Sequence, residues 1–267
     1  MSKTDPQISQ MAQIREGPIT FAGEMVRAIL EDRKTQTRRV IRPQPPVEPL
    51  ISGSQYHPGD RLWVRENWRV GAWSEDRCAI AVDYKADSFS RQEWIVLPDE
   101  DQFERLWLQS TDDAIAAGRR ADEDGKYHWD PGCSPCRWRS SRFMPKVLAR
   151  IRLEVLNAEP QQLQDISEAD CAAEGVQIPV ERVKDPPVTG LLRVSGSFAP
   201  INYFPKNYQP HRLPIEERTR IWLRAHFASL WDSLHARDGH GWREKPWVWV
   251  ITFKRLESAR PISDSDE

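Results

Sequence analysis

The order of short strands and helices constrains the fold of this chain most. Alternation of apolar and polar residues over four to eight positions is typical of a half-buried strand, whereas a 3.6-residue period is typical of a helix. The strands outnumber the helices, their spacing does not suggest βαβ units, and no glycine-rich phosphate loop occurs. The pattern therefore predicts an α+β fold, and a small mixed barrel fits it better than a doubly wound sheet. Strands are predicted at 18–22, 35–41, 61–68, 79–84, 147–156 and 247–256, and helices at 24–31, near 103–108, at 167–174 and at 215–235.

Local signals mark where several of these elements begin or end. Ser167 is a candidate N-cap, and Asp170 occupies the position of the acid in a capping box. Gly175 then supplies a stop for that helix. In the strand predicted at 147–156, the alternation changes phase near Arg150, which predicts a slip or bulge there.

The segments between the elements indicate the domain organisation. We expect a disordered leader at 1–16, a single domain at 17–256 and an acidic, serine-rich tail at 257–267. Two stretches of that domain, at about 88–136 and 177–214, lack a sustained period and contain many turn-forming residues. We interpret them as insertions.

Composition limits the classes of protein to which the chain can belong. A net charge of −2 argues against a protein that coats nucleic acid non-specifically. Mean hydropathy is −0.67, and no apolar run approaches the length of a membrane span. The N-terminus has no apolar signal core. We therefore expect no membrane partner and a cytoplasmic location, and the sequence does not indicate an oligomeric state.

The average charge hides a strongly basic segment. Residues 137–152 contain six basic residues and no acidic one. Such a run forms either a solvated strand edge or a binding face. If the fold places it beside Lys34 and Arg39, an anion-binding groove is favoured.

Four cysteines raise the question of a metal. Cys133 and Cys136 form a single CxxC, His128 lies five residues before it, and Cys78 could complete a tetrahedral site. A second CxxC is absent, so a plain loop is the alternative, and no other cofactor is expected. Cys171 falls in a helical pattern and is expected to be packed.

The basic loop Asp32–Arg39, DRKTQTRR, carries the main functional signal. It lies where a short helix gives way to a strand, and it contains one lysine, three arginines and two threonines. Its charge attracts phosphates and nucleobase edges. It also places the amine of Lys34 near the hydroxyl of Thr37, which is a pairing suited to covalent or general-base catalysis.

Five segments of the chain carry a family resemblance: PITFAGEMVRAILEDRKTQTRRVIRPQP, HPGDRLWVRENW, LQDISEADCAAEGV, FASLWDSL and PWVWVITFKRL. Together they resemble the ASCH-domain proteins, including a longer set often encoded by bacteriophages and prophages. The resemblance covers nearly the whole chain outside the two insertions. It implies a PUA-like mixed β-barrel with flanking helices, a fold associated with RNA binding, and it would place a phage-encoded chain in the bacterial host cytoplasm.

The family signature GxKxxExR falls on Asp32, Lys34, Thr37 and Arg39. The lysine and the arginine match, whereas the glycine and the glutamate do not. Threonine in place of that glutamate resembles the far shorter bacterial ASCH amidohydrolases that deacetylate N4-acetylcytidine. Their site uses a lysine, a threonine three residues later and a distant glutamate, and alignment of LQDISEADCAAEGV with their helix places that glutamate on Glu174.

The resemblance implies an amide hydrolase with a Lys-Thr-Glu site. Thr37 would attack, Lys34 would accept its proton, and Glu174 would orient the ammonium or return a proton to the leaving amine. Lys34 must first be neutral, and at a pKa of about 10.4 only about one molecule in a thousand or fewer is neutral at pH 7. Burial and nearby arginines lower that pKa, and Glu174 opposes them. Alternatively, Lys34 stays charged and clamps an oxyanion or a phosphate.

Further residues are candidates for binding the modified nucleoside or RNA. Trp63 and Trp68 flank the strand beside the expected pocket, where one of them could stack on a base, although packing is the favoured role for each. The alternative to catalysis is an RNA-binding module of phage origin that uses the basic run, including Arg150. An RNA nuclease ranks third, because no pair of histidines suggests acid–base chemistry. The full set of binding candidates is Arg33, Arg38, Arg39, Trp63, Arg65, Trp68, Arg139 and Arg142.

Overall fold

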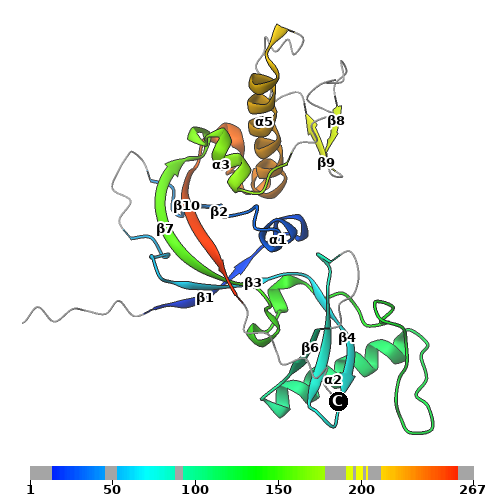
Figure 1. The fold of residues 1–267 in the computed structure, drawn as a ribbon. Coiled ribbons are helices and arrows are strands. Elements are labelled where there is room, and N and C mark those ends of the chain that lie inside the picture. Colours follow the sequence, from blue (N-terminus) through cyan, green and yellow to red (C-terminus); the bar gives the residue numbers. More distant parts are fainter. Residues whose placement is uncertain are drawn as a thin grey trace, which may run out of the picture.

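A computed structural model of the chain describes residues 14–45, 53–87, 93–177, 191–194, 197–200, 203 and 212–257, with the backbone alone at 191–194 and 197–200. Within these residues the protein combines helices with a five-stranded, a three-stranded and a two-stranded sheet (Figure 1). The α+β class predicted from the sequence is confirmed, but the described strands form three separate open sheets rather than the mixed barrel that was predicted. Most of the predicted leader, tail and 177–214 insertion lies outside the described residues.

The five-stranded sheet has the order β1-β3-β7-β10-β2. Strands β1 and β3 are parallel, and the other neighbours are antiparallel. Strands β7 and β10 are long and curved (Figure 1), and β1 and β2 form the two edges of the sheet. The strands span Glu16–Thr20 (β1), Gln36–Val40 (β2), Arg61–Arg65 (β3), Arg152–Gln162 (β7) and Trp247–Leu256 (β10).

Both faces of this sheet are covered, which explains the nearly continuous apolar run in β10. Trp249, Ile251 and Phe253 belong to a core shared with helix α1 (Gly23–Leu30). Val248 and Val250 alternate with them and pack toward helices α3 (Glu168–Ala173) and α5 (Ile215–His235). Strand β2 lies at the edge of the sheet and contacts α3. Its side chains alternate between the two faces of the sheet, so each one points either toward the core shared with α1 or toward the core formed with α3 and α5.

A smaller lobe follows β3 and has a core of its own. Three antiparallel strands, β4 (Trp68–Ser74), β5 (Ala79–Tyr84) and β6 (Glu93–Val96), pack against helix α2 (Glu100–Ala116) (Figure 1). The side chain of Asp99 caps α2 by accepting a hydrogen bond from the backbone N–H of Gln102. Strands β8 (Leu191–Val194) and β9 (Ser197–Pro200) form the third sheet. Short 3₁₀ turns occur at Ser141–Phe143, Lys146–Leu148, Leu163–Asp165, Ala236–Asp238 and Trp242–Glu244.

Three predicted strands were wrong at their ends. The strand expected at 18–22 lies two residues earlier, at Glu16–Thr20. The strand expected at 61–68 divides at Glu66, because Trp68 begins β4 in the other sheet. The strand expected at 147–156 begins only at Arg152, because Leu148 is buried in the core of the smaller lobe. It then continues to Gln162. The pairing irregularity lies at Leu156, which the register of β7 with β10 skips, rather than near Arg150.

The stretch interpreted as an insertion at 88–136 contains β6 and α2, and α2 is longer than the helix expected near 103–108. Its buried stripe includes Ser110 and Asp113 beside Phe103 and Leu106. These polar residues interrupt the apolar period from which a helix is predicted. The strands at 79–84 and 247–256 and the helix at 215–235 are confirmed at their predicted ends, and the capping box is present. No helix in the described ranges has both the length and the apolar character required to cross a bilayer.

Candidate functional site

Lys34 lies in the turn between α1 and β2, and only 2% of its surface is exposed. The backbone N–H groups of Arg33 and Lys34 both donate to the carbonyl of Ala28, at 2.8 and 3.0 Å. The next N–H, that of Thr35, donates to Ala173 at the end of α3, at 2.9 Å. These bonds hold the turn against α1 on one side and α3 on the other.

The amine of Lys34 meets three acceptors. Its Nζ lies 2.6 Å from Oε2 of Glu174, 3.0 Å from the carbonyl oxygen of Glu174 and 2.8 Å from that of Gln36. Three acceptors satisfy the three N–H groups of an ammonium. Glu174 is also the C-cap residue of α3, where the helix dipole favours a cation. The resting arrangement is therefore an ammonium paired with a carboxylate.

Gly175 permits this close approach. Its φ of 88° lies in the left-handed region that glycine adopts readily. A Cβ at this position would lie 2.8 Å from the Cβ of Ala28 and 3.2 Å from the Cβ of Lys34. Gly175 therefore ends α3 and, because it has no Cβ, also leaves room for Lys34 to approach Glu174.

Arg38 is the second cation on Glu174. Its Nη1 lies 3.2 Å from Oε1 of Glu174 and 2.8 Å from Oε1 of Gln36, and its Nη2 lies 2.9 Å from Oε1 of Gln161. Asp170 approaches the same guanidinium at 3.3 Å, on the more exposed side. The buried Nε of Arg38 has no acceptor among the described residues.

Thr37 and Arg39 lie on the opposite face of β2 from Arg38, because side chains alternate along a strand. Arg39 donates to the carbonyl of Thr20 at 2.7 Å, and its Cζ lies 5.2 Å from the centroid of the Phe21 ring. The Nζ of Lys34 lies 5.4 Å from the same centroid. Phe21 therefore joins Lys34 and Arg39 on the face that carries Thr37. In the described part of the chain, no hydrogen bond reaches the buried Thr37 hydroxyl from Lys34.

Positive charge exceeds negative charge in this cluster. Burial lowers the pKa of Lys34 from its ordinary value, the carboxylate of Glu174 partly offsets this, and Arg39 and Arg38 lower the pKa further. Burial also lowers the pKa of Arg39, whose Nε lacks an acceptor among the described residues. Such a site favours an anion, or negative charge that develops during a reaction.

Other predicted binding residues lie elsewhere. Leu62 and Val64 of β3 join the core of Phe21, so Trp63 and Arg65 face the other side, where Trp63 packs in the core of the smaller lobe. Trp68 belongs to that same core. The structure therefore divides the candidates into a cluster of Lys34, Thr37, Arg38, Arg39 and Glu174, and a second group of Trp63, Arg65, Trp68, Arg139 and Arg142.

Two further arginines have structural partners. Arg33 pairs with Glu31 at 2.5 Å and donates to the carbonyl of Gly175 at 3.2 Å, so it borders the cluster from outside. Arg150 was expected on an RNA-binding surface, and this was wrong. Its buried guanidinium is bonded to Glu66 and Asp87, which leaves it no surface to offer a nucleic acid.

The candidate zinc ligands do not converge. Cys136 is buried, with its Sγ 3.7 Å from the carbonyl oxygen of Ser110, whereas Cys133 is exposed. His128 bonds to Asp122 instead, at 2.6 Å. No group of three or more histidine, cysteine or acidic residues in the described ranges is arranged to hold a metal. Cys136 instead packs in the core of the smaller lobe, against α2.

Several members of the cluster were not predicted. Gln36 could have been found from strand alternation, because it lies two residues before Arg38 on β2. Phe21 follows β1 and Gln161 lies at the end of β7, and they approach the cluster only in the fold. Comparison of the chain with family models, curated proteins and solved structures finds no match in any of the three. The function therefore has to be argued from this geometry.

Proposed function

We propose that the protein is an ASCH-type amidohydrolase that acts on an N4-acylated cytidine or a related acylated pyrimidine nucleoside. The observation that carries this proposal is the buried ion pair of Lys34 and Glu174, 2.6 Å apart and contributed by residues 140 positions apart in the sequence. These are the positions to which the resemblance assigns the lysine and the glutamate of the Lys-Thr-Glu site. Under this proposal the curved five-stranded sheet is the core of a PUA-like fold.

The backbone at Asp32 supports the resemblance. This residue stands where the family signature has glycine, and its φ is 55°. Glycine adopts this left-handed region at no steric cost, and aspartate tolerates it better than most residues. The turn before Lys34 thus has the conformation for which a glycine at this position is suited.

The proposed reaction cleaves the C–N bond of the exocyclic amide. Thr37 Oγ1 attacks the acyl carbon and passes its proton to neutral Lys34, and that proton then moves to the departing cytidine nitrogen. Water hydrolyses the acyl ester on Thr37, which releases the carboxylate and regenerates the hydroxyl. Arg39, whose Nε has no acceptor within the described part of the chain, stabilises the oxyanion of both tetrahedral intermediates. Glu174 holds the lysine in place throughout.

The lowered pKa of Lys34 matters because only the neutral amine accepts a proton. Deprotonation lets the amine give up one of its three acceptors and reach toward Thr37. On this mechanism kcat/KM rises with pH as Lys34 loses its proton, and it levels off above the lowered pKa. A clamp role for charged Lys34 would give the opposite trend.

The test is turnover of N4-acetylcytidine by the purified protein, with cytidine and acetate quantified by chromatography. Thr37→Val, which removes the hydroxyl at constant shape, is expected to reduce kcat/KM at least about 100-fold, in line with loss of a catalytic nucleophile. Thr35→Val is the matched control, because Thr35 is exposed in the same loop and should leave turnover unchanged. Absence of turnover across a panel of N4-acylated cytidines would contradict the proposal.

A further inference from the structure

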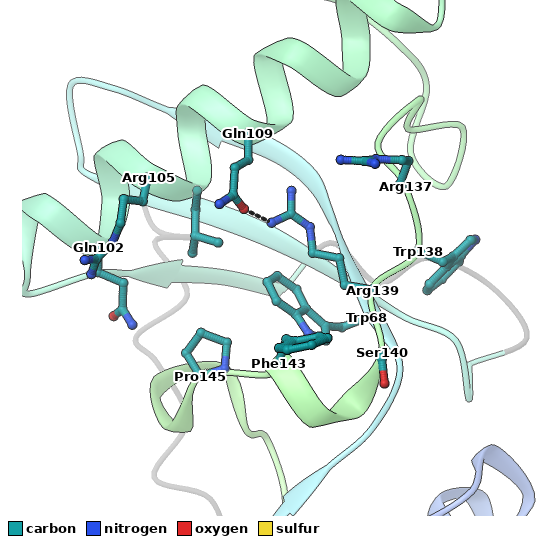
Figure 2. A pocket seen from close by; sticks show the side chains of 11 residues that line it. Trp68, Gln102, Arg105, Gln109, Arg137, Trp138, Arg139, Ser140, Phe143 and Pro145 are labelled. Carbon is teal, nitrogen blue, oxygen red and sulfur yellow. Dashed lines mark hydrogen bonds between the residues drawn. The ribbon is translucent and has the colours of Figure 1, made fainter.

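A cleft of about 750 Å³ lies in the smaller lobe, between α2 and the segment after the CxxC (Figure 2). It belongs to the lobe of β4 and α2 rather than to the sheet that carries Lys34. The proposed hydrolase makes no use of it. Its walls combine arginines with aromatic rings: Arg105, Arg137, Arg139, Trp68, Trp138 and Phe143.

The side of the cleft formed by α2 has no aspartate or glutamate among its lining residues. Gln102, Arg105 and Gln109 line it at the i, i+3 and i+7 positions of one helix face. Arg105 has no hydrogen-bond or ion-pair partner within the described residues. The helix is acidic overall, but its exposed acids Glu100, Asp101, Glu104 and Asp112 are absent from the lining.

The opposite side is an extended segment fixed to β4. Arg139 and Trp68 exchange backbone hydrogen bonds of 2.7 and 3.2 Å, so Arg137 and Arg139 point to the same side. Both reach buried Asp113, Arg137 through Nε at 2.5 Å and Arg139 through Nη2 at 3.4 Å. Asp113 therefore balances one of the two positive charges, and with Arg105 the cleft keeps a net positive charge.

The aromatic residues supply surfaces for stacking. Phe143 is 72% exposed at the edge of the cleft, although an apolar ring of this size is ordinarily buried. Trp68 also lines the cleft but is only 1% exposed, and its buried indole N–H has no acceptor in the described part of the chain. An unpaired buried donor in the wall of a cleft is costly unless a ligand supplies an acceptor.

We propose that this cleft binds a nucleotide unit, that is, an aromatic base joined to a phosphate, either free or within a single strand. The base stacks on Phe143, and the phosphates are held by arginines. Arg105 and Arg137 lie on opposite sides of Phe143 in Figure 2, so a single strand crossing the ring contacts both, whereas a free nucleotide contacts one. Stacking on an aromatic ring with flanking cations is the usual form of sequence-tolerant single-strand recognition.

The experiment measures binding of a fluorescently labelled eight-nucleotide single-stranded RNA by anisotropy, with AMP and UMP as competitors. We expect Phe143→Ala to weaken binding about 5- to 150-fold, the loss typical of one stacked base. Arg105→Glu should weaken it at least about 10-fold and reduce the slope of log Kd against log salt by about one. Both residues are exposed, so folding of the variants should be retained and can be checked by circular dichroism.

A control variant separates this site from others. Arg237→Glu makes the same charge change at an exposed position after α5 and should leave binding unchanged. No residue of the Lys34 cluster lines the cleft, so failure of the proposed hydrolase would not affect this result. Competition by AMP or UMP at the affinity of the oligomer supports a free-nucleotide site, and binding of the oligomer alone supports a strand site. No binding of either probe, or binding unaffected by both cleft variants, would overturn the proposal.

Discussion

Two buried ion-pair networks in this protein have similar ingredients and opposite charge balance. One guanidinium, Arg150, is bonded to two carboxylates through four hydrogen bonds of 2.8 to 3.0 Å, two to Glu66 and two to Asp87. In the other network, one buried carboxylate, Glu174, is shared by Lys34 and Arg38. Each network is enclosed in the fold, so solvent screens neither strongly.

The titration behaviour of the two networks differs accordingly. Burial by itself would lower the pKa of Arg150, but hydrogen bonds to Glu66 and Asp87 outweigh it and raise the pKa. Burial lowers the pKa of Lys34, and the single carboxylate only partly offsets it. The first network holds one cation between two carboxylates. The second has three cations, Lys34, Arg38 and nearby Arg39, against Glu174 and the more exposed Asp170, and the Nε of Arg38 has no acceptor among the described residues.

Their positions match this difference. Glu66 follows β3, Asp87 follows β5 and Arg150 precedes β7, so the first network ties the smaller lobe to the five-stranded sheet. The second joins an edge strand to the end of α3. The Arg150 network, in which each nitrogen of the guanidinium donates to a carboxylate, joins two parts of the fold. The Glu174 network lies at a sheet edge and has an unpaired donor among the described residues, so it can accept a ligand.

The largest expected effect is that of Arg150→Met. The substitution leaves two buried carboxylates without a cation, so the free energy of unfolding should fall by about 3–5 kcal/mol. Urea denaturation measures this directly. Arg152→Met is the control, because Arg152 meets Glu16 at the protein surface and its loss should be small. A small loss for Arg150→Met would remove the structural role argued for that network.

A smaller loss is expected for Lys34→Met. Arg38 remains bonded to Glu174, so the carboxylate keeps a partner and the cost should be about 1.5–3 kcal/mol, the contribution of hydrogen bonds to a charged group. The same denaturation experiment measures it. A loss as large as that of Arg150→Met would show that Lys34, rather than Arg38, compensates Glu174.

The pH dependence should differ between the two networks. Because the folded state lowers the pKa of Lys34, the unfolded chain binds more protons between that lowered pKa and the ordinary value near 10.4. The contribution of Lys34 to the free energy of unfolding therefore increases with pH between the two pKa values and does not change with pH below the lowered one. The difference in unfolding free energy between wild type and Lys34→Met should increase from pH 7 to 10. Arg150 itself contributes no such rise, because hydrogen bonds to Glu66 and Asp87 outweigh burial and raise the pKa of its guanidinium above the ordinary value.

The smallest effect is expected at an exposed pair on the same sheet. Lys254 of β10 lies 3.2 Å from Glu154 of β7, and both side chains are partly exposed. Lys254→Met should change the free energy of unfolding by no more than about 1 kcal/mol. Repetition in high salt should reduce even that difference. A larger, salt-independent loss would mean that burial is not what distinguishes the two enclosed networks.

Local patterns in the sequence determined much of the secondary structure. Strand β5, strand β10 and helix α5 have their predicted ends, and Ser167 with Asp170 forms the capping box, because periodicity and capping depend on neighbouring residues only. The pairing of Lys34 with Glu174 was expected from the family resemblance, and the structure brings the two residues together. Their catalytic role remains a proposal.

Tertiary structure alone decided the partners and the faces. Both faces of a strand show the same alternation, so the sequence could not show which side of β3 carries Trp63. It also could not show that the guanidinium of Arg150 is buried between Glu66 and Asp87. Gln161 meets Arg38 from 123 residues away, and no local pattern encodes such a contact. The chain by itself thus determined where strands and helices form, because that choice is local. Packing against distant segments decided which charges are buried together and which of them are left without a partner.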